Sequence, residues 1–186
     1  MDAALTELIG RLDAAVAEPT SETITSRVKA DLEQILGGGR LHLPARFRAP
    51  RSEGYARRLL YQDPANRYTA VVMTWGPGQG TPVHDHGGLW CVEGVIEGAM
   101  QVTQYDVRAD GDAFAVVPTG APLAAGVGSA GRLIPPTDYH VLGNAQPDAI
   151  SLTLHVYGGD LNGCRIFSPR SDGRFTASVR SLCYHE

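Results

Sequence analysis

The chain has little cysteine and no run of basic residues. Its 186 residues include 3 widely spaced cysteines and carry a net charge of −4. An odd number of scattered cysteines is not a disulfide framework, so we expect a reducing compartment and, by default, a cytoplasmic protein. Without basic runs, the chain has no electrostatic footprint for nucleic acid. The partner is therefore expected to be a small molecule.

Apolar segments long enough for a membrane are also missing. No apolar run approaches the roughly 20 residues of a membrane-spanning helix, and the first residues lack the basic start of a signal peptide. Hydrophobic residues make up 43% and charged residues 19% of the chain, which is ordinary for a globular protein and argues against disorder. We predict a single domain over residues 1–186, acting as a monomer without a membrane partner.

The first forty residues differ in pattern from the rest. Apolar residues recur at helical spacing over residues 5–16, before Pro19, and again over residues 24–36, before three consecutive glycines. Segment 1–40 is therefore predicted to form two amphipathic helices. We expect them to pack as a wall on one side of the main sheet.

Short β-rich runs separated by turn residues follow from Tyr55 onward. The 22 glycines and 12 prolines are dispersed, which suits many short strands joined by turns. Helices followed by about nine strands predict a helical cap on a sandwich or closed barrel at about residues 55–183. The strands are predicted near residues 55–61, 67–75, 81–85, 89–97, 98–107, 113–118, 139–143, 149–157 and 174–183.

Two histidines two residues apart carry the densest chemistry of the sequence. On a strand, His84 and His86 would point to the same face and could chelate one metal ion. The pair alone is a weak signal, because such pairs also occur by chance and on surfaces. His140, which opens a later predicted strand, is a candidate third ligand.

A second polar group occupies alternate positions of one predicted strand. Thr153, His155 and Tyr157 share a face, and each buried polar group without a partner would cost about 1–3 kcal/mol. The row therefore indicates a polar network beside a site, with a self-satisfied cluster as the alternative.

The spacing of these residues matches the two motifs of the cupin superfamily. The first motif has a glycine, His-x-His, a glutamate and a glycine, and the second has a proline, a glycine, a histidine and an asparagine. The chain departs from them twice, with Cys91 where the glutamate belongs and Thr137 in place of a glycine. The matching residues are Gly78, His84, His86, Gly98, Pro135, His140 and Asn144.

The cysteine in place of the glutamate resembles the cysteine dioxygenase family, and the similarity runs from about Tyr55 to Phe167. This resemblance implies a mainly β cupin barrel, a double-stranded β-helix or jelly roll, with the two N-terminal helices packed on it. It also implies Fe(2+) as cofactor. The ligands implied for the iron are His84, His86 and His140.

The same resemblance implies roles for four further side chains. Cys91 and Tyr157 are similar to the cysteine and tyrosine that form a thioether in the family. His155 and Thr153 would lie behind the tyrosine. The family usually has serine at the position of Thr153, and this replacement keeps the hydroxyl.

The segment Tyr55-Ala56-Arg57 looks like the Tyr-x-Arg segment of the family, whose arginine holds the substrate carboxylate. Strand alternation places Tyr55 and Arg57 on one face and Arg58 on the other, so we expect Arg57 to bind the substrate carboxylate. An insertion in the following turn would shift the match to Arg58. The other alternative is that Arg57 is a surface arginine held in a salt bridge. Related enzymes that prefer 3-mercaptopropionate carry glutamine here, which favours a cysteine-like substrate.

The chemistry of the implied site explains the missing glutamate. Three neutral imidazoles leave the metal its formal charge of about +2 and several open positions, so Cys91 in place of a carboxylate leaves room for an anionic substrate. We expect an Fe(2+)-dependent dioxygenase that oxidises L-cysteine to cysteine sulfinate with O₂. The alternatives are a dioxygenase for 3-mercaptopropionate or mercaptosuccinate, a non-catalytic metal-binding cupin, and a zinc cupin with hydrolytic or isomerase activity.

The remaining conspicuous side chains are assigned structural roles. Trp75 and Trp90 are expected in the wall or core, and Cys164 and Cys183 are expected to be buried thiols. His185 is expected to be frayed.

Overall fold

The computed structural model describes residues 3–39 and 41–186. In these ranges two α-helices come first and twelve strands follow, so the predicted mainly β architecture is confirmed. The helices are α1 (Ala3–Ala15) and α2 (Ser21–Gly37), with a 3-10 helix η1 (Ala45–Arg48). The strands are β1 (Ala56–Gln62), β2 (Thr69–Trp75), β3 (Val83–His84), β4 (Cys91–Glu97), β5 (Ala99–Asp110), β6 (Ala113–Pro118), β7 (Leu123–Gly126), β8 (Ala130–Leu133), β9 (His140–Asn144), β10 (Ser151–Tyr157), β11 (Gly163–Pro169) and β12 (Phe175–Ser181).

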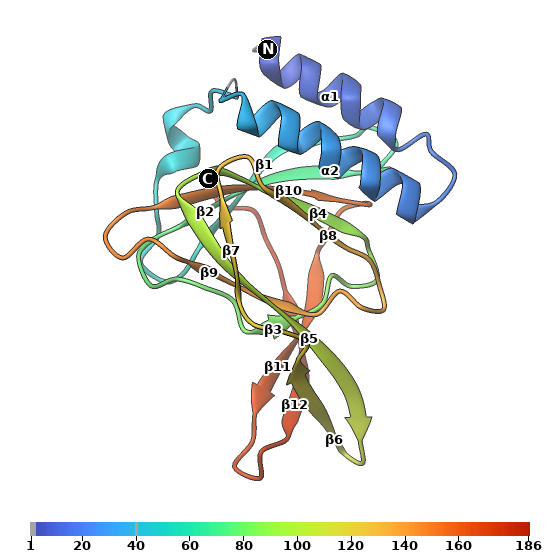
Figure 1. Cartoon of the computed structure of the whole chain (residues 1–186), viewed down its shortest axis with the longest axis vertical. Helices are drawn as coiled ribbons and strands as arrows, with labels where there is room; N and C mark the ends of the chain where they lie inside the picture. Colours follow the sequence, from blue (N-terminus) through green and yellow to red (C-terminus); the bar gives the residue numbers. More distant parts are fainter. Residues whose placement is uncertain (1–2, 40) are drawn as a thin grey trace.

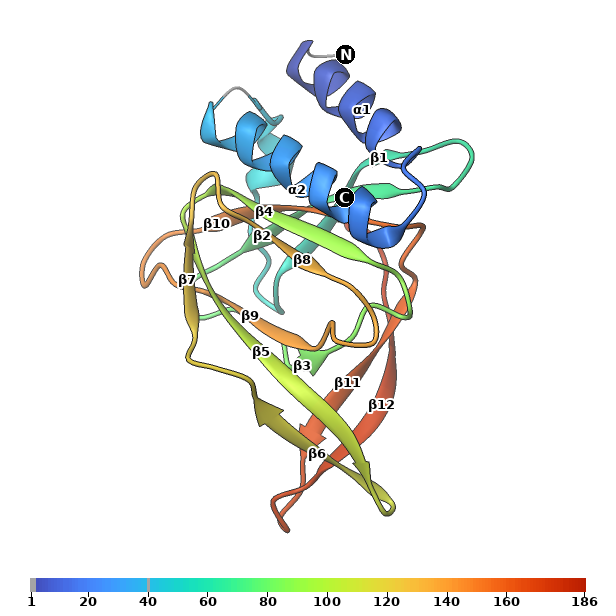
Figure 2. The same ribbon diagram turned by 45° about the vertical axis from the view of Figure 1, so that its right-hand side comes forward.

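The strands form two antiparallel sheets that close around an interior. One sheet has the order β1-β2-β10-β4-β8, and the other has the order β6-β12-β11-β3-β9-β5-β7. Figures 1 and 2 show the two sheets facing each other, with the hairpins of β5–β6 and β11–β12 projecting from one end. In the described ranges no helix is both long and apolar enough to span a membrane.

Helices α1 and α2 cover the outer face of the five-stranded sheet (Figure 1). Helix α2 begins with a capping box, in which the Thr20 hydroxyl accepts from the Thr23 amide at 3.2 Å. The apolar stripes predicted for both helices are buried against this face, as expected. A Cβ built on Gly94 of β4 would lie 2.6 Å from Leu36 Cδ1, so this glycine lets α2 approach the sheet closely.

Strands β2 and β10 are buried on both faces because they lie between the helices and the interior. On β10, Leu154 and Val156 pack in the core beneath the helices. The alternate residues point the other way because side chains of a strand alternate between faces. Thr153, His155 and Tyr157 therefore face the interior, as their spacing predicted.

The sequence missed three strands, namely β7, β8 and β11. Strands β7 and β8 read Leu-Ala-Ala-Gly and Ala-Gly-Arg-Leu, and these small residues carry a weak signal for a strand. Two smaller predictions were also wrong. Cys183 is exposed rather than buried. His185 is held on β1, since its Nδ1 accepts from the Arg57 amide at 2.9 Å and its own amide donates to the Arg57 carbonyl at 2.7 Å.

Arg67 ties the β1–β2 hairpin to helix α1. It donates from its backbone amide and its Nε to Asp63 Oδ2, both at 2.9 Å, and from Nη2 to Asp63 Oδ1 at 2.8 Å. Its Nη2 also donates to Asp13 of α1. The hydrogen bonds from Arg67 lower the pKa of Asp63 from 3.8 to about 2. Asp63 is therefore ionised in the folded protein at neutral pH, and its charge contributes to the folded state.

We expect Asp63→Asn to destabilise the fold in a pH-dependent way. The pKa of Asp63 is lower in the folded than in the unfolded chain, so its contribution is fully present above pH 3.8 and is lost as the pH falls through about 2. Melting curves from pH 7 down to pH 2 should show a difference in melting temperature between wild type and variant, and this difference should disappear toward pH 2. Asp148→Asn, at an exposed turn position, is the matched control. A difference in melting temperature that does not change with pH would contradict the role of the Asp63 charge.

Candidate metal centre

Three imidazoles converge inside the barrel from two neighbouring strands. His84 of β3 lies directly opposite His140 of β9, and His86 follows in the loop after β3 rather than in a strand. His86 and His140 are buried, and His84 is half-buried. Positive φ angles of 59° and 85° at Gly87 and Gly88 let the chain turn away directly after His86. The strand pairing thus brings together residues that are 56 positions apart.

The spacing of the imidazole nitrogens fits one metal ion. His84 Nε2 and His140 Nε2 lie 3.2 Å apart. One ligand atom from each of the three histidines lies within 4.8 Å of the others. An ion bound at about 2.0–2.1 Å from each nitrogen can span such separations. The three predicted ligands are therefore brought together.

The remaining nitrogen of each ring faces an oxygen. His84 Nδ1 lies 3.1 Å from the carbonyl oxygen of Pro82, His86 Nδ1 lies 3.1 Å from Asp138 Oδ2, and His140 Nδ1 lies 3.5 Å from Glu93 Oε1. A histidine that binds a metal usually donates its other N–H to such an acceptor, which fixes the tautomer and the ring orientation. This arrangement leaves all three Nε2 atoms for an ion. His140 Nδ1 is a buried atom without a hydrogen bond, and its tautomer depends on Glu93.

The rings of His84 and His140 are suited to metal binding at neutral pH. Burial, and then the neighbouring His86, lower the pKa of His84 to about 4. Burial, and then His84, hold the pKa of His140 well below 6.5. Metal ions bind the neutral imidazole, so no proton has to be displaced from these rings at pH 7.

A carboxylate that the sequence analysis missed lies behind the ligands. Glu93 is 8% exposed, and its Oε1 and Oε2 lie 3.5 Å from His140 Nδ1 and 3.4 Å from His155 Nδ1. Burial raises its pKa to about 8. Glu93 faces the far nitrogen of a proposed ligand and takes no ligand position itself. The signal was present, since Glu93 stands two residues after Cys91 on the same strand face.

The polar row of β10 is a chain of hydrogen bonds that begins at a tryptophan. Trp75 Nε1 donates to Thr153 Oγ1 at 2.9 Å, and Thr153 Oγ1 lies 2.7 Å from His155 Nε2. The indole can only donate, so the threonine oxygen accepts from Trp75, and its contact with His155 Nε2 holds that face of the ring while Nδ1 faces Glu93. The His155 and Tyr157 rings are nearly parallel, with centroids 6.1 Å apart. His155 thus lies behind Tyr157 and bonds to Thr153.

Cys91 and Tyr157 are direct cross-strand neighbours in the pairing of β4 with β10. Their relative exposures are 0% and 2%. Directly opposed residues on one face of an antiparallel pair have Cβ atoms about 4.5–5.5 Å apart. Burial is the largest effect on both groups and raises the pKa of the thiol and of the phenol well above their ordinary values. Both groups are therefore neutral at pH 7.

The two candidate arginines point in different directions. Arg57 lines the same small cavity as the three histidines, together with Tyr55 and Tyr157. Arg58 instead donates to Thr74 Oγ1 at 3.1 Å and to the Ala49 carbonyl at 2.8 Å, outside that cavity. The alternation of β1 thus puts Arg57 on the metal side, as expected from the sequence.

The sequence model of the cysteine dioxygenase type I family matches residues 44–170, which is more than half of the chain. The chain belongs to the cysteine dioxygenase type I family. Family membership supports a thiol-dioxygenase type of function and a metal-dependent site, and the three-histidine group could hold such a metal. The three histidines, Cys91, Glu93, Tyr157 and Arg57 all lie inside the matched segment.

One solved structure supports the fold independently of the family, and two others are similar more loosely. An uncharacterized conserved protein with a double-stranded β-helix domain from Klebsiella pneumoniae is 16% identical, with a TM-score of 0.50, and the match covers 77% of this chain and 93% of that one. The cupin domain of Schizosaccharomyces pombe Cnp3 is 13% identical (TM-score 0.42, covering 57% and 61%). A cupin superfamily protein from Desulfitobacterium hafniense is 12% identical (TM-score 0.45, covering 64% and 92%). At 16% identity the Klebsiella structure shows the double-stranded β-helix fold alone.

We expect Asp138→Asn to weaken metal binding without unfolding the protein. Asp138 is 2% exposed and accepts hydrogen bonds from the His86 amide at 2.9 Å and from the His86 ring at 3.1 Å. Loss of such a carboxylate behind a ligand typically lowers metal affinity about 10- to 100-fold. Metal titration of the apoprotein measures the change. Asp106→Asn, whose carboxylate pairs with Arg108 on the surface, should bind metal as wild type does. Equal affinity in all three proteins would refute the role of Asp138.

Proposed function

We propose that this member of the cysteine dioxygenase type I family oxidises L-cysteine to cysteine sulfinate with O₂, using Fe(2+) held by His84, His86 and His140. One thiol and one O₂ give one sulfinic acid, so both oxygen atoms are retained in the product. The observation that carries the proposal is a buried arginine without a counter-ion that lines the same cavity as the three histidines.

Arg57 is only 3% exposed. Among the described residues no carboxylate forms an ion pair with it, and its nearest acceptors are the carbonyls of Leu161 at 3.3 Å and Cys183 at 3.4 Å. Its Nε has no hydrogen-bond partner. An unpaired buried charge is costly, so the fold retains this guanidinium for an anion that arrives later. The planar fork of arginine suits a carboxylate, which it can bind through two parallel hydrogen bonds.

The remaining lining positions the substrate between arginine and metal. The Tyr55 ring stacks on Trp75, with centroids 4.5 Å apart and planes at 27°, so the phenol beside Arg57 is held in place. Iron bound at the three histidines would supply the acidification of a thiol and the electron transfer to dioxygen that the reaction needs. Three neutral imidazoles keep positions open for an anionic substrate, with Glu93 and Asp138 behind the ligands rather than among them.

Tyr157 is proposed as the catalytic residue that donates a hydrogen bond at the reacting sulfur and oxygen atoms. A thioether between Cys91 Sγ and the ring carbon beside the hydroxyl would fix the phenol and lower the cost of ordering it. Formation of this bond removes one hydrogen from the thiol and one from the ring, with O₂ as the oxidant. Their direct cross-strand pairing supports the proposal.

Other small thiol carboxylates could use the same arginine, and 3-mercaptopropionate and mercaptosuccinate are the alternatives. A non-catalytic cupin would leave the Cys91–Tyr157 pair and the unpaired Arg57 without a purpose. Oxygen uptake by the iron-loaded protein with each thiol, and identification of the products by mass, test the proposal. Turnover of L-cysteine below that of the other thiols would overturn the assignment of L-cysteine as the substrate. No oxygen uptake with any of the thiols would overturn the proposed dioxygenase activity.

We expect Arg57→Ala to raise KM for L-cysteine by at least about 30-fold, equivalent to roughly 2 kcal/mol, because it removes a charge-assisted pair with the carboxylate. Arg57→Lys should recover only part of this loss, because it keeps the charge but not the fork. Arg58→Ala should lower thermal stability while KM changes little, since its hydrogen bonds lie outside the cavity. A KM effect confined to Arg58→Ala would mean that the strand assignment is wrong.

We expect part of the purified protein to carry the Cys91–Tyr157 bond, seen in intact mass as the loss of the two hydrogens. Cys91→Ala should give only the unlinked mass and a slower enzyme, since the phenol remains. Tyr157→Phe should lose more activity, because it removes the hydroxyl itself. Equal activities of the two variants would contradict the role proposed for the hydroxyl.

A further inference from the structure

We propose that Cys91, Glu93 and His155 form a second metal site, separate from the three histidines and suited to zinc. One ligand atom from each of the three side chains lies within 4.8 Å of the others. Their relative exposures are 0%, 8% and 2%, so all three are buried. None of the three is a ligand of the iron proposed above.

The backbone brings the three side chains together. Cys91 and Glu93 are alternate residues of β4, so they point to the same face. His155 of β10 lies directly opposite Glu93 in the antiparallel pairing. The set therefore stands on two paired strands in the middle of a sheet, where positions are held more firmly than on loops.

The donor set is one that zinc prefers. A thiolate, an imidazole and a carboxylate are the three ligand types of protein zinc sites. Three protein ligands would leave the fourth, tetrahedral position for water. A soft thiolate favours zinc over magnesium or calcium. On binding, the metal displaces the thiol proton of Cys91, the carboxyl proton that burial retains on Glu93 at pH 7 and any proton on His155 Nδ1, and all of these protons go to solvent.

Two features of the surroundings favour an ion over an empty cluster. Glu93 Oε2 is buried without a hydrogen-bond partner, which is costly unless something positive lies near it. The other nitrogen of His155 is already held, because its Nε2 bonds to Thr153 at 2.7 Å and Thr153 is fixed by Trp75 at 2.9 Å. This support turns the Nδ1 of His155 toward Glu93, at 3.4 Å from Oε2.

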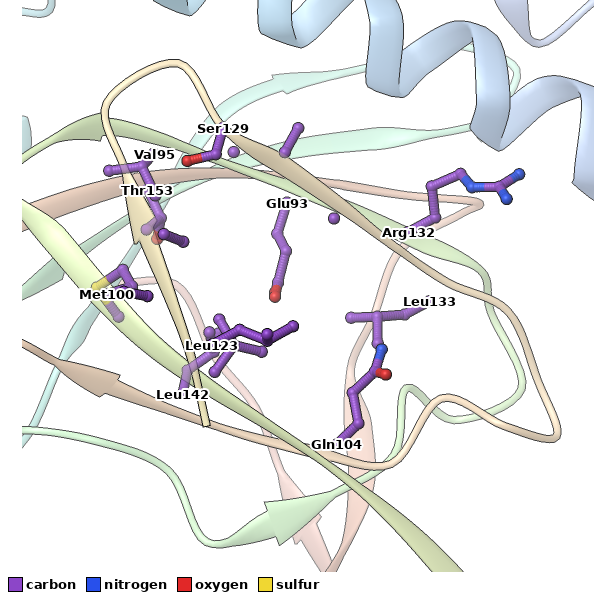
Figure 3. Close-up of a pocket in the computed structure, with 16 residues that line it drawn as sticks. Glu93, Val95, Met100, Gln104, Leu123, Ser129, Arg132, Leu133, Leu142 and Thr153 are labelled. Carbon is purple, nitrogen blue, oxygen red and sulfur yellow. The ribbon is translucent and has the colours of Figure 1, made fainter. Parts of the chain in front are cut away.

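A cavity gives the ion a route to Glu93. It has a volume of about 200 Å³ and lies among β4, β5, β7, β8 and β9. Figure 3 shows the Glu93 side chain reaching into it, between Leu133 on one side and Leu123 and Leu142 on another. The neighbour of Glu93 on β8 is Gly131, which adds no side chain and has nothing within 4 Å of its Cβ position. Leu123 is 63% exposed, so the cavity reaches the surface.

A metal at this site would control the chemistry next to it, and this consequence rests on the proposed function. The sulfur of Cys91 is the atom that would join Tyr157, and a thiolate bound to zinc is not free to form that bond. Glu93 Oε1 also faces His140 Nδ1 at 3.5 Å, so one carboxylate would link the two metal sites. Zinc would thus hold the protein in its unlinked form.

Cobalt(II) is the probe for the experiment, because it replaces zinc and gives a strong near-ultraviolet charge-transfer band only when a thiolate binds it. The full chain is produced without iron and oxygen, and its intact mass is checked to be unlinked. We expect two cobalt ions per chain and a thiolate band that saturates with one of them. The three-histidine site contributes no sulfur, so the band reports the second site alone. No turnover is involved, so failure here is distinct from failure of the proposed function.

Variants assign the band to the three side chains. Cys91→Ser should abolish it, and Glu93→Gln should weaken the binding that produces it. Thr153→Val, which keeps the shape but removes the hydroxyl behind His155, should lower the affinity about 10- to 100-fold. Gly131→Leu should slow or block binding by filling the cavity. The matched controls Cys164→Ser and Cys183→Ser should keep the band, as should His84→Ala, with cobalt at the second site.

Three outcomes would overturn the site. One is a single cobalt ion per chain without a thiolate band. Another is a band that survives Cys91→Ser and disappears with Cys164→Ser or Cys183→Ser. The third is unchanged affinity in Thr153→Val and Gly131→Leu, which still tests the proposal if Cys91→Ser or Glu93→Gln does not fold. Zinc added before exposure to iron and air should also lower the linked fraction seen by mass.

Discussion

The antiparallel pairing of β4 with β10 determines most of the chemistry inside this barrel. It sets Cys91 opposite Tyr157 and Glu93 opposite His155, and all four side chains face the interior. Because side chains alternate along a strand, a slip of one residue would turn all four toward helix α2 and bring apolar residues inward. The burial of β10 on both faces makes such a slip costly. The helices that cover the outer face therefore act on the site, although they contribute no residue to it.

The site balances charges that the sequence motifs do not mention. Two carboxylates, Asp138 and Glu93, stand behind the histidines, and the guanidinium of Arg57 lines the same cavity without an acid of its own. The positive charge of Arg57 and the Asp138 carboxylate at His86 are thus not paired with each other, and burial raises the pKa of Glu93 to about 8, so that group is largely protonated at pH 7. Under the proposed function, an anionic substrate at Arg57 and a divalent cation at the histidines would therefore not compete for the same protein group.

Sequence reasoning found the residues whose spacing is fixed by a motif or by strand alternation. His84, His86 and His140 followed from the cupin spacing, and Arg57 followed from the alternation of one short strand. Asp138 and Glu93 were missed because their roles depend on partners far along the chain, His86 for the first and His140 with His155 for the second, although strand alternation after Cys91 already placed Glu93 on the same face. Strands β7 and β8 were missed because their small residues are held by pairing with β5 and β4 rather than by their own propensity. Local patterns predicted elements and ligands, whereas long-range pairing decided what surrounds them.

The segment that follows β12 has a consequence for how any substrate arrives. Cys183 accepts from Arg57, the Tyr184 ring lies 5.2 Å from the guanidinium carbon, and His185 binds the backbone of Arg57. The cavity beneath has a volume of only about 20 Å³, which is room for about one water molecule. The segment thus takes up part of the hydrogen-bonding capacity of Arg57 and covers its guanidinium. Under the proposed function, a thiol carboxylate would replace the Cys183 carbonyl as the partner of Arg57, so changes in residues 182–185 would alter the apparent affinity for substrate without touching the metal centre.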